Sequence, residues 1–396
     1  QPDEVLDIFI PEWDEEPVES SFNLRVMNPP PYTPNDPMYP DQWDKPITET
    51  DWAWNTTKGE GAIIAILDVG VDTTHEDLKD NLYRCYNSVD NDSNYHDTRS
   101  HGTRCCGYAA ARIDNNVGIA GMAGEASLMV IRIFPDVGGA PTSVIINAIN
   151  YAVDNGAKVI SMSFGAYGNV GLEWTLNSAW DRGVFSCAGA GNDNSDNPFY
   201  PAAYEKVMGV GTTTSDDERY SDSNYGPNAQ IFAPCGLTTT PGNNYGSGTA
   251  TSYSTPQVAG LAALIYSAYP HAKPQQVWDN IIQGADTIDS DVGPILRMNS
   301  RKAVEKEIIA VDEGRPEPAA VSAHGIQSGV IRFVCELSGP YTLRIFDVTG
   351  SQVYETNGVT DARGEVICNP DIGQGVYFWR FKASEGTSSG KFVYVR

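Results

Sequence analysis

Residues 61–70 read GAIIAILDVG, and this stretch indicates which class of fold the chain adopts. Six consecutive apolar residues, 62–67, end at Asp68 and a glycine-containing turn. A continuous apolar run of this length is typical of a strand buried on both faces, as in a parallel sheet.

Further runs of this kind follow along the chain and alternate with helical patterns. The run SLMVIRIF at 127–134 is followed by the amphipathic pattern TSVIINAINYAVDNG at 142–156. Three more strand-like runs are found at 157–165, 183–192 and 206–213. Strands that interleave with helices imply a parallel sheet with both faces covered. We therefore predict an α/β domain over residues 48–310, with a parallel sheet covered by helices on both faces.

The two ends of the chain differ in composition from this central part. Residues 1–47 are rich in Pro, Asp and Glu, so we predict an extended acidic arm that lies on a domain or hangs free. Residues 311–324 begin with VDEGRPEPAA and are predicted to form a linker. Strand-like runs separated by turn signals roughly every 8–12 residues fill 325–396, which predicts a small antiparallel β-sandwich.

The charge balance limits the partners and the location of the protein. Fifty-one acidic and 26 basic residues give a net charge of −25. This charge argues against nucleic acid as a partner, because phosphate binding requires basic patches. No apolar run approaches the roughly 18 residues of a membrane span. The chain begins at Gln1 without an apolar signal segment, so we expect a mature form, secreted or at the cell surface.

Seven cysteines occur without the paired C-x-x-C spacing of a metal site. Their odd number permits up to three disulfides with one thiol left over, which fits an oxidising compartment. The sequence leaves the pairing open. We also expect the protein to be a monomer.

Four side chains with reactive or donor groups lie where strands end or a helix begins. Asp68 follows the first strand, His101 opens a small-residue segment, and Asn192 ends the fourth apolar run. Ser252 precedes Pro256, which fits the first turn of a helix, so this serine lies at or just inside a helix start. Each residue alone is typical of a turn, a structural histidine or a helix cap. Together at one end of an α/β sheet, an acid, a histidine and a serine can form a nucleophilic relay.

The residues around these positions resemble the motifs of the subtilisin-like serine peptidases, in the same order along the chain. The motifs are AILDVGVDTTHEDL at 65–78, SHGTRCCG at 100–107, AGAGN at 188–192 and TSYSTPQVAG at 251–260. The resemblance covers about residues 35–305 and implies a serine endopeptidase that acts on protein and peptide substrates. It implies that Asp68 is the catalytic carboxylate and His101 the general base. It also implies that Ser252 is the nucleophile and that Asn192 donates to the oxyanion.

The resemblance further implies where a peptide substrate binds. The segment ISMSFG resembles the strand that lines the primary specificity pocket, and the loop VGGA resembles the edge that pairs with extended substrate. The residues so implied are Ser163, Phe164 and Gly165 in the pocket and Val137, Gly138, Gly139 and Ala140 in the loop. Small residues in these segments indicate a roomy pocket.

The histidine motif departs from the usual family pattern. Arg104 stands where the family has a second histidine, and HGTRC resembles the kexin- and furin-like branch, which prefers basic residues before the cleaved bond. Asp193 follows Asn192 and would lie at the pocket rim, where it would favour Lys or Arg. The companion domain of that branch is larger than the C-terminal module here, which speaks against membership of that branch. A broad degradative specificity is therefore the open alternative to a preference for basic residues.

Two further residues near the expected site are unusual. Ala250 stands two positions before Ser252, where the family usually has glycine. Cys105 comes four residues after His101 and would lie on the same helix, behind the imidazole. We expect the odd thiol here, and inhibition by mercurials.

Two segments resemble those that hold the strong calcium site of the family. They are EDL at 76–78 and RIDNNVGIAG at 112–121. The resemblance implies, as ligands, the side chains of Asp77 and Asn115 and the carbonyls of Ile113, Val117 and Ile119. Oxygen ligands suit a hard cation such as calcium, and the alternative is a polar loop held by hydrogen bonds. No catalytic cofactor is expected.

The C-terminal module resembles the sorting domains of the type IX secretion system. The resemblance rests on GPYTLRIFDVTGSQVYE at 339–355, GQGVYFWRF at 373–381 and KFVYVR at 391–396. It implies that this module interacts with the secretion machinery. The alternative is a carbohydrate- or protein-binding sandwich. Cys335 and Cys368 are the cysteines of this module and could join its two sheets.

Two other functions compete with that of a peptidase. An inactive, subtilase-like surface binding module would have lost one of the four site residues, and all four are present here. An unrelated α/β hydrolase would carry G-x-S-x-G and place the serine before the acid and the histidine, which this chain does not.

Overall fold

The computed structural model describes residues 29–165 and 168–308, and the C-terminal module in the segments 322–326, 330–334, 339–347, 351–360, 365–368, 370–373, 375–383 and 386–394. Residues 31–47, which we assigned to the arm, belong to the same unit as the rest of the chain, Pro31–Arg396. Residues 1–28 of the predicted arm lie outside the described residues.

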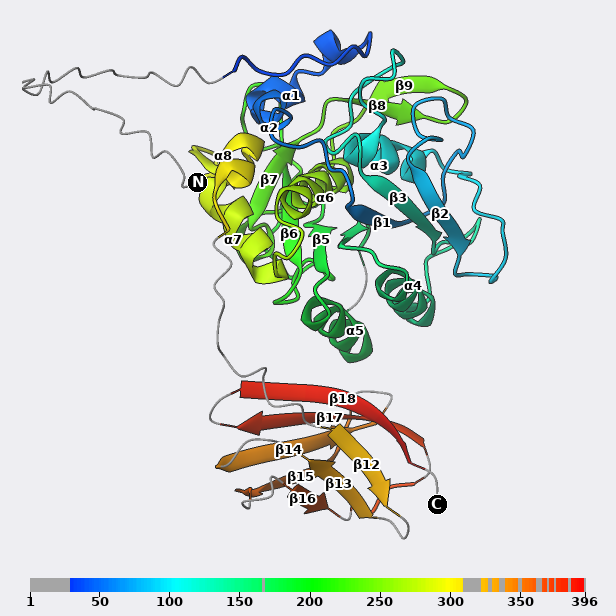
Figure 1. Cartoon of the computed structure of the whole chain (residues 1–396), viewed down its shortest axis with the longest axis vertical. Coiled ribbons are helices and arrows are strands. Elements are labelled where there is room, and N and C mark those ends of the chain that lie inside the picture. The colour runs from blue at the N-terminus through cyan, green and yellow to red at the C-terminus, as the bar shows by residue number, and fades with distance from the viewer. Residues whose placement is uncertain are drawn as a thin grey trace, which may run out of the picture. The chain divides into compact units, whose positions relative to one another are not determined.

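A central sheet organises the part of the chain that we predicted to be α/β. Its strands are β1 Ile63–Asp68, β2 Leu82–Asn87, β3 Ser127–Arg132, β4 Val159–Met162, β5 Phe185–Gly189, β6 Met208–Thr213, β7 Ile231–Pro234, β10 Asp286–Ile288 and β11 Ile295–Arg297. Their order is β10-β11-β7-β6-β5-β4-β1-β3-β2. All neighbours from β11 to β2 pair in parallel, and β10 is antiparallel to β11. The predicted parallel sheet is therefore confirmed (Figure 1).

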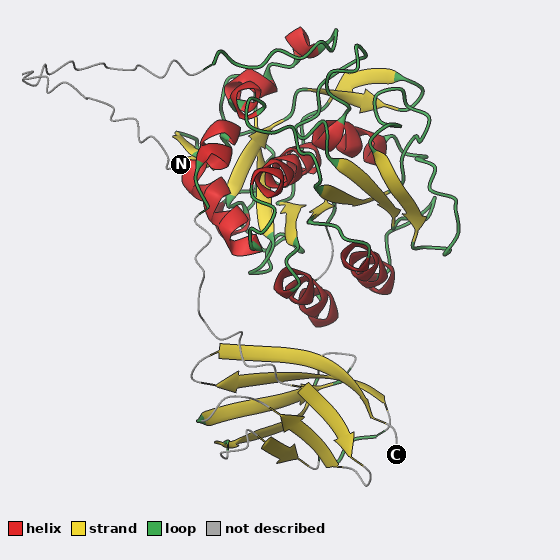
Figure 2. Cartoon of the chain, in the orientation of Figure 1, coloured by secondary structure: helices red, strands yellow, loops and turns green. Residues whose placement is uncertain are grey.

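Helices cover both faces of this sheet, as predicted (Figures 1 and 2). The helices of four residues or more are α1 Asp44–Ile47, α2 Thr50–Ala53, α3 His101–Ala110, α4 Thr142–Asp154, α5 Val170–Asp181, α6 Thr251–Ala268, α7 Pro274–Gly284 and α8 Ser300–Glu305. Short 3₁₀ turns are η1 Tyr39–Asp41 and η2 Gly226–Asn228, and a hairpin of β8 Leu237–Thr240 and β9 Asn244–Ser247 precedes α6.

The side chains of β1 show how the two layers form. Ile64 and Ile66 point into a core shared with α3, α6, α7 and α8. Ala65 and Leu67 point into the opposite core, shared with α4 and α5. Successive side chains of a strand alternate between faces, so one continuous apolar run supplies both cores. Asp68, the next residue, is therefore carried to the carboxyl edge of the sheet.

Helix α6 lies in the middle of the first core and contacts α3, α7, α8 and the central strands. Its buried residues are found on all sides, as is typical of a helix surrounded by protein. The helix begins at Thr251, so Pro256 is its sixth residue. Our expectation that Pro256 lies in the first turn is therefore wrong. The early start requires another partner for the carbonyl that the proline cannot satisfy.

The described part of the C-terminal module consists of two antiparallel sheets, which confirms the predicted all-β architecture. The three-stranded sheet has the order β12-β13-β16 and the four-stranded sheet the order β15-β14-β17-β18. The bounds are β12 Ser322–Ile326, β13 Val330–Val334, β14 Pro340–Phe346, β15 Gln352–Val359, β16 Glu365–Cys368, β17 Gly375–Ala383 and β18 Gly386–Tyr394. Phe333 of one sheet packs on Trp379 of the other, with ring centroids 5.3 Å apart. Strand β12 begins at Ser322, inside the segment predicted as a linker. We did not predict a strand there, because SAHGI lacks an apolar alternation.

The cysteines that the structure describes form none of the disulfides that the sequence permits. All six cysteines in the described part of the chain are free thiols: Cys85, Cys105, Cys106, Cys187, Cys235 and Cys368. Cys335 lies outside the described residues, so the suggested pair with Cys368 concerns a thiol that is free here.

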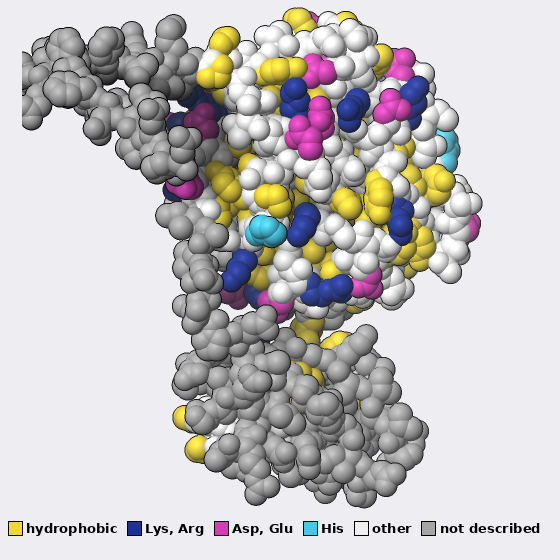
Figure 3. Space-filling view, viewed as in Figure 1, with side chains coloured by type: hydrophobic (Ala, Val, Ile, Leu, Met, Phe, Trp, Pro, Cys, Tyr) yellow, Lys and Arg dark blue, Asp and Glu magenta, His cyan; other side chains and the backbone are white. Residues whose placement is uncertain are grey.

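The surface mixes charges of both signs. Figure 3 shows Lys and Arg side chains interspersed with Asp and Glu on the visible face of the α/β domain, with apolar side chains between them. Among the described residues, no helix combines the length and apolarity needed to cross a bilayer.

Candidate active site

The carboxyl end of β1 and the beginning of α3 bring Asp68 and His101 together. Nδ1 of His101 lies 2.9 Å from both carboxylate oxygens of Asp68. Asp68 is buried, whereas 28% of the His101 side chain is exposed. A Cβ on Gly102 would lie 2.0 Å from the carbonyl oxygen of Gly70, so only glycine lets α3 start this close to β1. The Asp68 carboxylate raises the pKa of His101 above its ordinary value, because it stabilises the imidazolium.

Ser252 is the second residue of α6, and its backbone is held from the end of β4. Pro256 has no N–H, so the Ser252 carbonyl lacks the donor that a helix would normally supply four residues later. Ser163 supplies it instead, because its Oγ donates to the Ser252 carbonyl at 2.7 Å. The Sγ of Cys105 is a second donor, at 3.6 Å. The Oγ of Ser252 in turn donates to the Ser163 carbonyl at 3.4 Å.

Asn192 lies beyond β5 and contacts the start of the same helix. Its Oδ1 accepts a hydrogen bond from the Thr251 N–H at 2.9 Å. Gly191, at φ +104°, donates its N–H to the Thr251 hydroxyl at 3.3 Å. Because Oδ1 is turned toward the helix, the exposed Asn192 amide keeps its N–H₂ group as a donor near Ser252.

Three neighbours complete the surroundings of His101. Cys105 is fully buried, its Sγ lies 3.8 Å from His101 Nδ1, and burial raises the pKa of this thiol. The ring of Tyr253 lies 5.5 Å from the imidazole. We did not predict a role for Tyr253, although its position directly after Ser252 in the sequence could have indicated one. The guanidinium of Arg104 lies 5.9 Å from the Tyr253 ring.

The predicted substrate loop lies beyond β3 and is held by one arginine. Nη2 of Arg99 donates to the carbonyls of Pro135, Asp136 and Gly138. Val137 is 87% exposed, and Gly139 is exposed too, whereas Ala140 is half-buried. The loop therefore presents its backbone to solvent, as strand addition by an extended peptide requires.

Of the predicted pocket residues, Ser163 follows β4 and contacts Ser252 directly. Ser163 is buried against Ser252, Phe164 is half-buried and packs on Phe134, and Gly165 is exposed. Asp193 is exposed, and its N–H donates to the Asn224 side chain at 2.9 Å.

The predicted calcium residues are partly brought together. Asn115 Nδ2 donates to Asp77 Oδ1 at 2.8 Å, and the Ile119 N–H donates to Asp77 Oδ2 at 2.9 Å. The Val117 N–H donates to the side-chain oxygen of Asn115 at 2.8 Å. Ile113, two positions before Asn115, is buried. Hydrogen bonds therefore join the Asp77 carboxylate to the loop at 115–119.

Asp36 joins this cluster and was missed, because it belongs to the segment that we predicted as an arm. Its Oδ2 accepts the Asp114 N–H at 2.9 Å, and its Oδ1 is buried without a hydrogen-bond partner in the described structure. Burial raises the pKa of Asp36 to about 6. Burial and, to a smaller extent, the charge of Asp36 raise the pKa of Asp77 to about 7. Within the described part of the chain, neither of these two buried carboxylates forms an ion pair.

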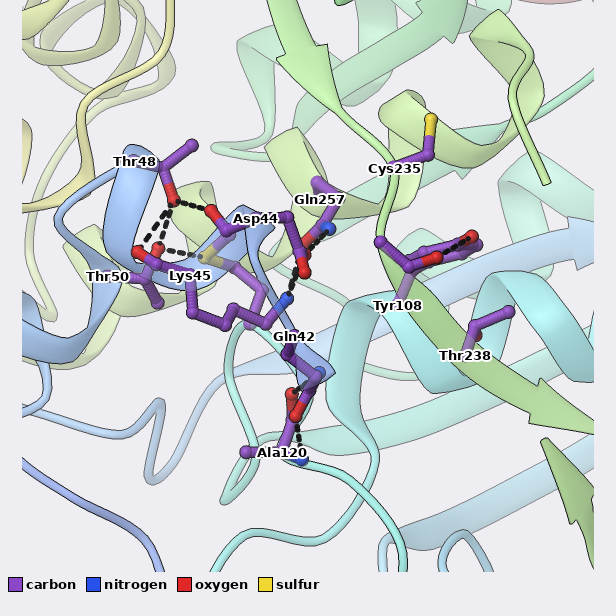
Figure 4. Close-up of polar contacts among 12 residues, drawn as sticks. Gln42, Asp44, Lys45, Thr48, Thr50, Tyr108, Ala120, Cys235, Thr238 and Gln257 are labelled. Atoms are coloured by element: carbon purple, nitrogen blue, oxygen red, sulfur yellow. Dashed lines mark hydrogen bonds and ion pairs between the residues drawn. The ribbon is translucent and has the colours of Figure 1, made fainter. Parts of the chain in front are cut away.

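A buried ion pair anchors the segment before β1 to the helix that carries Ser252. Lys45 and Asp44 are both buried, and Lys45 Nζ lies 2.8 Å from Asp44 Oδ2 and 2.9 Å from Gln257 Oε1 (Figure 4). Gln257, on α6, donates from Nε2 to the same Asp44 oxygen at 2.6 Å. Gln42 bonds both backbone groups of Ala120, next to the Asp77 cluster.

Known proteins resemble this chain in sequence. The sequence matches the subtilase family over residues 59–309. Thermitase from Thermoactinomyces vulgaris is 40% identical over 240 residues, which cover 60% of this chain and 86% of thermitase. The thermophilic serine proteinase of Bacillus sp. strain AK1 is 42% identical over 241 residues, 60% of each protein. Subtilisin E of Bacillus subtilis strain 168 is 36% identical over 232 residues, 56% of this chain and 60% of subtilisin E.

Solved structures agree with these relatives. Proteases from Pseudoalteromonas arctica PAMC 21717 superpose with a TM-score of 0.64 at 28% identity, over 69% of this chain and 98% of theirs. A cold-adapted subtilisin-like serine proteinase gives a TM-score of 0.57 at 27% identity, over 62% of this chain and 90% of its own. The family match extends over more than half of the chain and includes every residue of the Asp68, His101, Asn192 and Ser252 cluster. The chain therefore belongs to the subtilase family of serine endopeptidases.

Proposed function

We propose that the chain cleaves peptide bonds through an acyl-enzyme on Ser252, with His101 as base, Asp68 as its orienter and Asn192 as oxyanion donor. The observation that carries this proposal is the pair of 2.9 Å contacts between His101 Nδ1 and the Asp68 carboxylate. A proton held on Nδ1 leaves Nε2 free to accept one from a hydroxyl.

In the proposed reaction, Ser252 Oγ leaves the Ser163 carbonyl, transfers its proton to His101 Nε2 and attacks the substrate carbonyl carbon. The carbonyl oxygen becomes an oxyanion, which the Asn192 amide stabilises by donation. The C–N bond breaks as His101 returns the proton to the leaving amine. Water then attacks the acyl-enzyme with the same base and releases the carboxylic acid.

Hydrolysis of an unfolded protein substrate tests this proposal. Wild type, Ser252→Ala, His101→Ala and Asp68→Asn would be compared for casein cleavage. We expect each variant to lose on the order of 10⁴-fold or more in rate, because the three groups act as a unit. A wild-type protein that binds casein without cleaving it would favour the inactive binding module instead.

We propose that calcium binds between Asp36, Asp77 and Asn115. The donors are side-chain and backbone oxygens, which suit this hard cation, and the two buried carboxylates provide the negative charge that it requires. The ion would fasten the segment around Asp36 to the loop at 113–119. Chelation should lower the melting temperature of wild type, whereas an Asp36→Asn/Asp77→Asn variant should no longer respond to added calcium.

The remaining parts of the function rest on sequence resemblance. We propose that the protein is secreted or displayed at the cell surface, with the C-terminal module as a sorting domain of the type IX kind. Deletion of residues 325–396 should then retain the peptidase inside the cells that make it. Asp193 and the HGTRC motif favour cleavage after basic residues. A pocket too short for a Lys or Arg side chain would exclude that preference.

A further inference from the structure

The space beside Ser252 is bounded by the carboxyl ends of two neighbouring strands. Strands β4 and β5 pair in parallel, and the chain beyond them runs through Ser163 to Gly165 and through Gly189 to Asn192. Ser163 contacts Ser252 directly, and Asn192 contacts Thr251. The side chain of the residue before the cleaved bond therefore enters between these two segments once Ser252 attacks. This step rests on the proposed function.

The ring of Phe199 lies between the same two segments. A Cβ built on Gly165 would lie 2.2 Å from Cζ of Phe199, at the tip of the ring. A Cβ built on Gly191 would lie 3.1 Å from Cγ, at the opposite end of the ring. Because Cγ and Cζ are the two ends of one ring, Phe199 reaches from one wall of the space to the other. The absence of a side chain at Gly165 is what allows the tip of the ring to lie against that wall.

The neighbours of Phe199 in sequence hold it in this place. Tyr200 packs against the core of α4 and α5, and its ring lies 4.7 Å from that of Tyr204. The hydroxyl of Tyr204 accepts the Asn169 N–H at 2.7 Å and lies 3.0 Å from the Asn169 carbonyl. Phe199 itself is half-buried, and its carbonyl accepts the Ala203 N–H at 3.0 Å. The ring is thus carried by an anchored segment rather than by a free loop.

We propose that Phe199 fills the inner part of the primary specificity pocket and restricts the residue before the cleaved bond to Gly, Ala or Ser. An aromatic or long side chain would have to occupy the volume of the ring. The same obstruction keeps a Lys or Arg side chain from extending into the pocket, whatever the attraction of Asp193 at its rim. The protein is then an endopeptidase for small residues, not a processing enzyme for basic ones.

Peptide p-nitroanilides that differ only in the last residue, Ala, Phe or Lys, test this proposal. Wild type should cleave the Ala substrate with a kcat/KM at least about tenfold above those of Phe and Lys. Phe199→Ala should raise kcat/KM for the Phe substrate by about tenfold or more and change that for Ala little. Phe199→Leu should give an intermediate ratio. Tyr83→Ala, a truncation of an exposed tyrosine on β2, is the matched control and should keep the wild-type ratio.

A fluorophosphonate distinguishes the two ways in which this experiment can fail. If Ser252 is labelled in wild type and in Phe199→Ala, but the ratio of Phe to Ala cleavage is the same in both, the role of Phe199 is overturned alone. A wild-type preference for Phe or Lys overturns it as well. If Ser252 is labelled in neither protein, both the proposed function and the pocket assignment are overturned. Mapping of cleavage sites in unfolded casein by mass spectrometry provides a second measurement, in which small residues should precede most cuts.

Discussion

Ser163 and Ser252 exchange two hydrogen bonds across the end of the sheet. The hydroxyl of Ser163 donates to the Ser252 carbonyl at 2.7 Å, and the Ser252 hydroxyl donates to the Ser163 carbonyl at 3.4 Å. The first bond exists because Pro256 cannot donate to that carbonyl. A proline inside a buried helix thus frees the Ser252 carbonyl to accept a hydrogen bond from Ser163, just beyond β4.

Ser163→Ala should destabilise the protein, because it removes the shorter of the two hydrogen bonds to the partly buried Ser252 carbonyl. We expect a loss of about 1–3 kcal/mol in the free energy of unfolding, measured by urea titration in a Ser252→Ala background that prevents self-digestion. Ser186→Ala is the control, since the buried Ser186 hydroxyl on β5 has no partner in the described structure. Equal losses in the two variants would contradict this account.

The pH dependence of kcat/KM should be set by His101. Asp68 raises the pKa of His101, so activity should increase with pH as the imidazole loses its proton, with a midpoint above the ordinary value of about 6.5. The stability contributed by the charged pair is present below that ordinary value and is lost as the pH rises through the raised pKa. Asp68→Asn should move the midpoint of the residual activity to lower pH. An unchanged midpoint would contradict the assigned cause.

Mercurials should inhibit the enzyme through Cys105, because its sulfur lies 3.8 Å from His101 and contacts the Ser252 carbonyl. Alkylation by iodoacetamide should be slow, since burial raises the pKa of this thiol and little thiolate is present. Cys105→Ser should become insensitive to p-chloromercuribenzoate in an activity assay. Cys85→Ser is the control and should stay sensitive; the reverse pattern would place the reactive thiol elsewhere.

Lys45→Met should destabilise the fold strongly, because it leaves the buried Asp44 charge without its cation. We expect a loss of about 3–5 kcal/mol, and a smaller one for Asp44→Leu/Lys45→Met, which removes both charges. Urea unfolding in the Ser252→Ala background measures both. A double variant less stable than Lys45→Met would contradict the proposed cause.

Much of the fold could be predicted from sequence, because the central strands are continuous apolar runs with glycine or polar ends. Strand β1 is an example, and helix α4 could be predicted from its amphipathic pattern. Strand β2, LYRCYN, is half polar, and the hairpin of β8 and β9 is rich in threonine and glycine, so neither shows such a signal. The early start of α6 was missed because the partner of the Ser252 carbonyl, Ser163, is 89 residues away.

In the site too, residues in local sequence motifs could be predicted, whereas residues that act through distant contacts could not. Asp68, His101, Asn192 and Ser252 lie in short local motifs that sequence can show. Phe199, Asp36 and Lys45 act through contacts with residues distant in the chain; Lys45 and Gln257, for example, are 212 positions apart. The small residues of the pocket walls indicated a roomy pocket, whereas the ring that fills it comes from a different segment.

Labelling with a fluorophosphonate tests the central claim most directly. Wild type and Ser252→Ala would be treated alike, with the adduct located by mass spectrometry. We predict one adduct in wild type, on Ser252, that is absent from the variant and is blocked when His101 is replaced by Ala. Labelling of wild type at another residue, or no labelling with calcium present, would contradict the assignment of Ser252 as the nucleophile.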